Sequence, residues 1–478
     1  MSAPKGVRSH LAGLAGYGLM LGAAALAFHA IARRGAGLVA PDPAPDKIVH
    51  AAPSTSAHAL EHVLLALAVV ILLSRLVGAL FKRLHQPAVI GEVVAGIMLG
   101  PSLLGRFAPG ASAALLPQNI SPLLGIIAQV GVVLFMFLIG LELDVSLLKG
   151  RTRSSVAVSH ASILTPFTLG GVLALFLYPV LATNDVPFLT FALFIGVSMS
   201  VTAFPVLARI LTDRRMQQTR LGTIALTCAA VDDVTAWCLL AFVVSIAQGT
   251  AMKAAWTVLF AGVFVALMLL VVRPLVRKLV DLHERRGQLT QGMFAVVAVG
   301  LLLSALATEA IGIHALFGAF LFGALIPRSS RLAHEINDKL TDVVIVFFLP
   351  AFFAFTGLRT QIGLVSTWSQ WLFCGVIILV ATLGKFGGSF VAARLTGLSS
   401  RDAASLGILM NTRGLMELIV LNVGFDLGVI SPTLFAMLVL MALVTTFATT
   451  PILHLLQRHA PVEPILEVNP TVRDEPHG

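Results

Sequence analysis

The chain has 478 residues, of which 57% are hydrophobic and only 12% are charged, and its mean hydropathy is +0.94. A soluble domain carries about 25% charged residues, so this composition excludes a soluble globular protein. The net charge of +9 does not indicate a nucleic-acid partner, because the basic residues lie in short loops between apolar runs.

Apolar runs long enough to cross a bilayer repeat along most of the chain. One helical crossing needs about 20 apolar residues, and this window predicts thirteen transmembrane helices. They are residues 58–80, 87–106, 119–142, 156–180, 186–211, 220–248, 255–276, 290–311, 313–327, 341–358, 366–394, 403–423 and 431–455. The sequence therefore predicts an all-α, polytopic membrane protein.

The two ends of the chain differ from this central region. An Ala-, Gly- and Leu-rich stretch at residues 11–31 is either a fourteenth helix or a signal peptide. We therefore assign residues 1–57 to an extra helix or signal segment followed by a polar, extracytoplasmic linker. Residues 58–457 form the predicted transmembrane domain, and residues 458–478 a tail that is too short to fold alone.

Lys and Arg residues concentrate in alternate loops between the predicted helices. The opposite set of loops holds only Arg106, Lys253 and Arg359. Since cytoplasmic loops carry the excess of Lys and Arg, the rich side is cytoplasmic. We therefore expect a multi-pass protein of the cell (inner) membrane whose C-terminus is cytoplasmic. An odd number of crossings after the linker agrees with this orientation.

Two adjacent carboxylates, Asp232 and Asp233, lie near the middle of predicted helix 220–248. Ionisable residues at this depth cost several kcal/mol and are generally functional. Neighbouring helical residues point about 100° apart, so we expect one carboxylate to bind cation and proton in turn. Burial and the adjacent charge favour its protonation, while the other carboxylate takes a basic partner. The alternative is an intramembrane ion pair without a transport role.

The preceding predicted helix contains the segment Val-Thr-Ala-Phe-Pro at residues 201–205. Pro205 lacks an N–H donor and clashes with the carbonyl group four residues earlier. The freed carbonyl groups and the Thr202 hydroxyl supply oxygen ligands for a cation, and broken helices at mid-membrane are typical of transporter sites. A simple proline kink is the alternative.

A second interruption, Asn-Thr-Arg-Gly at residues 411–414, lies in predicted helix 403–423. Its place in the chain corresponds to that of Pro205, as an inverted repeat requires. Arg413 and Glu417 are four residues apart, so a purely structural ion pair is the alternative. The residues predicted to lie in unwound helix are Pro205, Asn411, Thr412, Arg413 and Gly414.

Lys385 lies well inside predicted helix 366–394. An ammonium group at this depth requires a carboxylate, and Asp232 or Asp233 is the expected partner. The alternative is a lysine that reaches water through a cavity. Glu142 and Arg359 lie nearer helix ends and are secondary candidates, since a position at a mouth or an interface also explains them.

Several long motifs occur in a fixed order between about residue 80 and residue 455. They are Gln86-Pro87 to Gly100-Pro101, Leu134 to Asp144, Val201 to Leu211, Ala229 to Trp237, Phe353 to Thr360 and Asn411 to Gly424. In these motifs the chain resembles the membrane domain of the monovalent cation:proton antiporter-2 family. The resemblance is greatest to plant-type cation/proton exchangers and their bacterial Kef-like relatives.

This resemblance implies a homodimeric, thirteen-helix antiporter with inverted repeats. In that fold a core bundle with two crossed, discontinuous helices moves against dimerisation helices. The ion-binding aspartate of the family falls on Asp233, and its unwound helices fall on Thr202–Pro205 and Thr412–Gly414. Lys385 and Arg359 resemble two basic positions of the family.

The implied function is secondary active exchange of a monovalent cation, Na⁺ or K⁺, for protons by alternating access, which serves pH and cation homeostasis without a cofactor. Plant-type members usually carry Asn-Asp where this chain has Asp232-Asp233. In the wider superfamily the double carboxylate accompanies electrogenic exchange, so we expect net charge to move in each cycle. Asp233 and Asp232 are the expected ligands of the monovalent cation.

Two other classes of function use part of this pattern. A channel has similar broken helices, but it does not need a protonatable carboxylate pair beside a lysine. An intramembrane aspartyl protease needs aspartates from two helices, whereas Asp232 and Asp233 are adjacent. The sequence therefore predicts a transporter rather than an enzyme.

Overall fold

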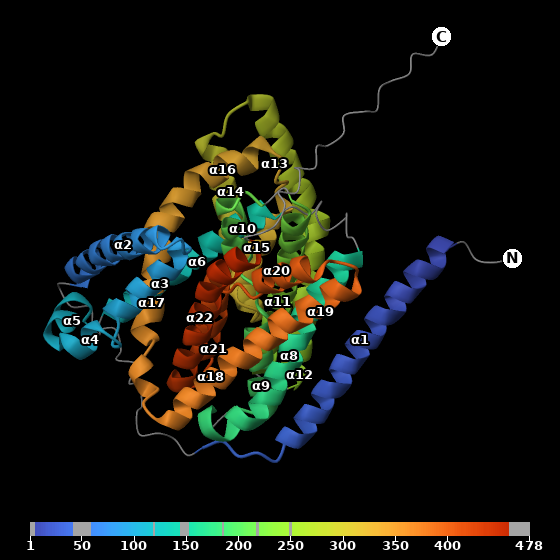
Figure 1. Cartoon of the computed structure of the whole chain (residues 1–478). Helices are drawn as coiled ribbons and strands as arrows, with labels where there is room; N and C mark the ends of the chain where they lie inside the picture. The colour runs from blue at the N-terminus through green and yellow to red at the C-terminus, as the bar shows by residue number, and fades with distance from the viewer. Residues whose placement is uncertain are drawn as a thin grey trace, which may run out of the picture.

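The computed structural model describes residues 5–41, 59–117, 120–143, 153–183, 186–216, 219–247 and 251–457. Every regular element in these ranges is a helix (Figure 1). Within the described residues, eleven helical segments are long and apolar enough to cross a membrane, or up to twelve if the bent pair Ser400–Met410 and Leu415–Asp426 counts as one crossing. The prediction of an all-α, polytopic membrane protein is therefore confirmed.

Predicted helix 313–327 is shorter than a full crossing. Its helical part is α15 (Ala315–Leu325), whose 11 residues extend about half the ~30 Å thickness of a hydrocarbon core. It follows α14 (Gln291–Ile311) after a tight turn in which Gly312 and His314 have φ angles of 92° and 73°. Thirteen crossings therefore stays a prediction.

One set of helices, which we call the scaffold group, packs together through close glycine contacts. Helix α3 crosses α17, and α15 crosses α6. A Cβ atom at Gly96 would overlap the carbonyl oxygen of Phe353, and one at Gly140 would overlap that of Phe320. Small residues thus let these backbones touch. The group consists of α2 (Ala59–Arg83), α3 (Ala88–Leu99), α6 (Ser121–Glu142), α14, α15 and α17 (Leu349–Arg359).

A second set, the core group, is built around α8 and α22. Helix α8 packs against α9, α11 and α19, and α22 packs against α18, α20 and α21. The group consists of α8 (Arg153–Leu181), α9 (Phe188–Ser200), α10 (Phe204–Asp213), α11 (Arg220–Ala247), α18 (Trp368–Thr382), α19 (Gly388–Leu395), α20 (Ser400–Met410), α21 (Leu415–Asp426) and α22 (Pro432–Gln457).

Two long segments extend beyond their predicted ends. Helix α12 (Ala251–Leu267) continues through a π-helical turn into α13 (Arg273–Arg286), and α16 (Arg331–Val343) continues through another into α17. Because α16 buries Leu332, Ala333 and Ile336 on one side, its polar sequence is that of an amphipathic helix rather than a loop. Helices α13 and α16 contact each other at the top of Figure 1.

The N-terminal stretch 11–31 lies within α1 (Lys5–Gly35). This helix packs against α8 and α9, with the rings of Phe28 and Phe167 4.9 Å apart between centroids. In Figure 1 it lies on the opposite side of the molecule from α2 and α3. Most of the predicted linker and the tail 458–478 fall outside the described residues.

Gly96→Val is expected to destabilise the protein, because the new side chain would meet the backbone of α17. Overpacking costs about 1–3 kcal/mol, and a backbone carbonyl group can move away from the new side chain only if its whole helix shifts. Gly292→Val is the matched control, since nothing lies within 4 Å of a Cβ at Gly292. In thermal unfolding of the purified protein, Tm should fall further for Gly96→Val; equal Tm values would contradict the close crossing.

Candidate functional site

Two interrupted helices touch inside the core group. Helix α9 ends at Ser200 and α10 begins at Phe204, while α20 ends at Met410 and α21 begins at Leu415. The N–H group of Ala203 in the first interruption donates to the carbonyl oxygen of Thr412 in the second at 3.0 Å. Helix ends leave backbone groups without intrahelical partners, so buried polar groups gather here.

Two buried cationic side chains cap the carbonyl end of α9. Arg413 donates to the carbonyl oxygens of Ser198 and Met199, both at 2.7 Å. Lys385 donates to the carbonyl oxygen of Ser200. The C-terminal end of a helix carries partial negative charge and favours cations. The last three carbonyl groups of α9 are therefore satisfied although the helix ends inside the bundle.

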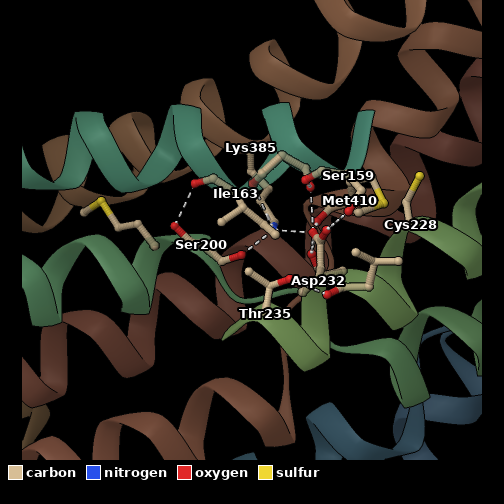
Figure 2. A network of polar contacts seen from close by, with 12 residues as sticks. Ser159, Ile163, Ser200, Cys228, Asp232, Thr235, Lys385 and Met410 are labelled. Atoms are coloured by element: carbon tan, nitrogen blue, oxygen red, sulfur yellow. Dashed lines mark hydrogen bonds and ion pairs between the residues drawn. The ribbon is translucent and has the colours of Figure 1, made fainter. Parts of the chain in front are cut away.

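Asp232 is completely buried and accepts four hydrogen bonds (Figure 2). Ser159 donates to its Oδ1 atom at 3.0 Å, and Ser162 donates to Oδ2 at 2.6 Å. Thr202 and Lys385 also donate to Oδ2, at 2.9 Å and 3.1 Å. The sequence predicts that Lys385 pairs with one of the two adjacent aspartates, and in the structure its partner is Asp232. Four donors, two of them from α8, thus surround this one carboxylate.

The backbone around Lys385 brings its ammonium group to this network. Lys385 lies in a π-helical turn, Leu383–Gly387, between α18 and α19, and such turns often occur at functional sites. Cβ atoms at Gly384 and Gly388 would overlap Pro166 and Ala161 of α8. The glycines therefore let the two helices approach until Lys385 Nζ lies 3.1 Å from the carbonyl oxygen of Ser162.

Asp233, the next residue, has a different environment. Its side chain is buried, and neither carboxylate oxygen has a hydrogen-bond partner of standard geometry. The N–H group of Phe204, at the start of α10, interacts with it more weakly. The N-terminal end of a helix favours a negative charge. Asp233 thus faces a helix end rather than a basic side chain.

Further buried oxygen atoms without partners lie in the second interruption. They are Asn411 Oδ1 and Thr412 Oγ1, and α20, which they follow, packs against the helix that carries Asp233. Nearly all buried polar atoms in proteins have a partner. Carboxylate, amide and hydroxyl oxygens are the ligands of hard cations, and these two atoms are of that type.

The buried charges at the crossing do not cancel. Asp232 pairs with Lys385 at 3.1 Å, and Glu417 pairs with Arg413 at 3.0 Å. Asp233 is the carboxylate left over among these five groups. With all five ionised, the cluster carries one excess negative charge, and an isolated buried charge is costly. One proton or one monovalent cation at Asp233 would neutralise it.

The other predicted site residues take structural positions. Pro205 lies in the first turn of α10, where its missing N–H is not needed, so it begins a helix rather than kinking one. Gly414 precedes α21 and contacts Val206 of α10. Glu142 is an exposed residue at the end of α6, and Arg359 ends α17 beside Asp426. Neither of the last two reaches Asp233 or Asp232 through a hydrogen bond or ion pair in the described residues.

Three residues of the network were not predicted from the sequence. Ser159 and Ser162 hold Asp232, and Thr446 of α22 binds both the N–H and the carbonyl oxygen of Arg413 at 2.9 Å and 2.7 Å. The available signal is spacing: two serines three residues apart share one face of an apolar helix. Thr446 has no comparable signal.

Comparisons with known proteins agree with this arrangement. The family model described as sodium/hydrogen exchanger, transmembrane, matches residues 67–456. The Na(+)/H(+) antiporter NhaS4 of Synechocystis sp. is 44% identical over 80% of this chain and 94% of its own length. Cation/H(+) antiporter 20 of Arabidopsis thaliana and K(+)/H(+) antiporter 1 of Saccharomyces cerevisiae are 38% and 33% identical, over 80% and 81% of this chain. The matches cover 47% and 45% of these two proteins, so the chain spans about half their length.

A solved structure shows the same fold at low sequence identity. The sodium proton antiporter MjNhaP1 from Methanocaldococcus jannaschii aligns with a TM-score of 0.56 and 16% identity. The alignment covers 83% of this chain and 97% of that one.

Lys385→Ala should lower the thermal stability, because it leaves Asp232 as a buried charge without its partner. Breaking a buried ion pair in this way costs ~3–5 kcal/mol. The double variant Asp232→Asn/Lys385→Ala removes both charges and should recover much of the lost Tm. A double variant no more stable than Lys385→Ala alone would contradict the pairing.

Proposed function

The chain belongs to the sodium/hydrogen exchanger family, and from this membership we propose that it exchanges a monovalent cation, Na⁺ or K⁺, for protons. The resemblance to the monovalent cation:proton antiporter-2 family is confirmed by its relatives. The observation that carries the proposal for the site is the single unpaired carboxylate, Asp233, beside two complete ion pairs.

In the proposed mechanism, proton and cation compete for Asp233. A bound proton neutralises the excess charge, and a cation that binds to the carboxylate oxygens displaces it. Asn411 and Thr412 supply further oxygen atoms, as does the Thr202 hydroxyl, whose lone pairs remain when its proton points to Asp232. Because either ligand neutralises the charge of the Asp233 carboxylate itself, the empty, charged form is disfavoured.

Alternating access would come from movement of the core group against the scaffold group. The packing supports an inverted repeat with a shift of seven crossings. The second predicted helix (α3) contacts the tenth (α17), and the ninth (α15) contacts the third (α6). The two contacts are equivalent, because a shift of seven relates the second helix to the ninth and the third to the tenth. The two interruptions lie in the fifth and twelfth predicted helices, which obey the same shift. This supports thirteen crossings in which α9–α10 and α20–α21 are crossed discontinuous helices.

The distribution of Lys and Arg supports an orientation for this architecture. We infer that the ends near α13 and α16 face the cytoplasm of the cell membrane, where the positive residues concentrate. The C-terminus then lies on the same side. Family resemblance supports a homodimer formed by scaffold helices.

Electrogenic exchange requires a second group that changes its charge. In the structure Lys385 is the partner of Asp232, and we infer that this is the cation-free state. A cation held by both carboxylates would replace the ammonium group of Lys385, which would then give up its proton. Protons would then leave both Asp233 and Lys385 for each cation bound, so that one net charge moves per cycle.

Asp233→Asn should abolish cation/proton exchange and leave the fold intact, because an amide cannot release a proton for a cation. The measurement is flux in proteoliposomes, with Na⁺, K⁺ and Li⁺ tested in turn. Glu142→Gln is the matched control, since it removes an exposed carboxylate at the end of α6. Retained proton-coupled flux in Asp233→Asn would reject the assignment, whereas loss in both variants would indicate a general defect.

Exchange should respond to membrane potential. One elementary charge moved across 100 mV corresponds to about 2.3 kcal/mol, so flux in liposomes clamped at zero and at ~100 mV should differ strongly. Asp232→Asn tests the origin of the effect, because it removes the second carboxylate. Rates that do not depend on voltage in the unaltered protein would show one-for-one exchange, in which Asp232 and Lys385 stay paired.

A further inference from the structure

Polar contacts between the scaffold and core groups gather where α17 and α21 end. Arg359 of α17 lies 2.6 Å from the carboxylate of Asp426 and donates to Asn422 Oδ1 at 3.2 Å, both on α21. Asn422 Nδ2 donates to Thr356 Oγ1 of α17 at 2.9 Å. Three hydrogen-bonded or ionic contacts thus join one turn of the scaffold group to one turn of the core group.

Aromatic rings hold the guanidinium group of Arg359 in this position. Its central carbon lies 3.9 Å from the ring centroid of Phe355 on its own helix and 5.5 Å from that of Phe425 on α21. A cation over an aromatic face is attracted to it. The Arg359 side chain is 20% exposed and that of Asp426 is 42% exposed, so water reaches the contact from one side.

The same two groups meet differently on the other side of the crossing. There they enclose a small cavity lined mainly by apolar residues, including Val93 of α3, Val206 of α10 and Leu418 of α21. In the orientation inferred above, this cavity lies toward the cytoplasm and the Arg359 contacts lie toward the outside. On the outer side, polar contacts of Arg359, Asn422 and Asp426 therefore join the scaffold group to the core group. Around the cavity, the two groups meet mainly through apolar side chains.

We propose that Arg359 is a positioning residue that holds the two groups together at their extracytoplasmic end and favours the inward-facing state. The proposal rests on the proposed function, because movement of the core group against the scaffold group must separate α21 from α17. Opening on the outer side breaks all three contacts at once. Their strength then sets the ratio of inward-facing to outward-facing molecules without touching the bound cation.

The test is the apparent KM for Na⁺ or K⁺ measured from each side of proteoliposomes that contain oriented protein. Arg359→Gln and Asp426→Asn should lower the KM on the outer side and raise it on the inner side, by about two- to fivefold for a partly exposed ion pair. Gln370→Ala is the control, since Gln370 caps α18 at the same end of the molecule through the N–H groups of Ser366 and Thr367 and, in the part of the chain that the structure describes, makes no hydrogen bond to α17 or α21.

Opposite shifts on the two sides support a change of conformational equilibrium. Unchanged KM values on both sides, or equal changes on both, would overturn the proposal, because a purely structural defect alters stability or maximal rate without this asymmetry. If the unaltered protein catalyses no exchange, the proposed function fails instead, so the two failures are distinguishable.

A cross-link provides a second test. Thr356→Cys/Asn422→Cys places two thiols where the native side chains touch at 2.9 Å, within reach of a disulfide. Oxidation should stop exchange, and a reductant should restore it. Ser102→Cys/Ile362→Cys is the control, because Ser102 Oγ lies 3.0 Å from the N atom of Ile362 at the outer end of the scaffold helices. Full exchange while positions 356 and 422 are cross-linked would show that α17 and α21 do not separate.

Discussion

The balance of charge where the non-helical stretches 201–203 and 411–414 meet is the constraint on which the rest of the site depends. Each break leaves helix ends in the buried interior, and each end favours a charge of the opposite sign. Arg413 and Lys385 meet the carbonyl end of α9, and these two cations in turn require Glu417 and Asp232. Asp233 lies outside both pairs, and in the proposed mechanism its charge is neutralised by a mobile proton or cation.

The surrounding packing makes this arrangement possible at close range. Gly384 of the π-helical turn and Gly388 directly after it let Lys385 approach α8, and two serines of α8 complete the hydrogen bonds of Asp232. Burying ion pairs is rarely a net source of stability. The network is better explained by position: it gives two adjacent carboxylates different surroundings, with Asp232 held by four donors and Asp233 by no basic side chain.

Much of this site could be predicted because ionisable residues in apolar segments are rare and conspicuous. Asp232, Asp233, Lys385 and the Arg413–Glu417 pair all stand out in the sequence, and their expected neighbourhood in space follows from the need to neutralise them. The choice of Asp232 over Asp233 as the partner of Lys385 could not be predicted. It depends on the direction of each side chain and on Ser159 and Ser162, whose residue type is ordinary in membrane helices.

The fold, too, could be predicted from the sequence only in part. Long apolar runs locate most crossings, whereas they do not reveal α16, because its apolar positions follow a helical period that a window average conceals. The short α15 is the opposite case, since the apolar run predicts a crossing at 313–327 but the helix that forms there has only 11 residues. The contact of Arg359 with Asp426 joins residues 67 positions apart through tertiary packing, which no local pattern encodes.

Proton release on cation binding tests the central claim most directly. Na⁺ or K⁺ is added to the purified protein in weakly buffered detergent solution, and the pH change is recorded beside the amount of cation bound. If Asp233 holds either a proton or a cation, binding releases protons in the unaltered protein, and Asp233→Asn shows no such release. Cation binding without proton release, or undiminished release in Asp233→Asn, would contradict the account.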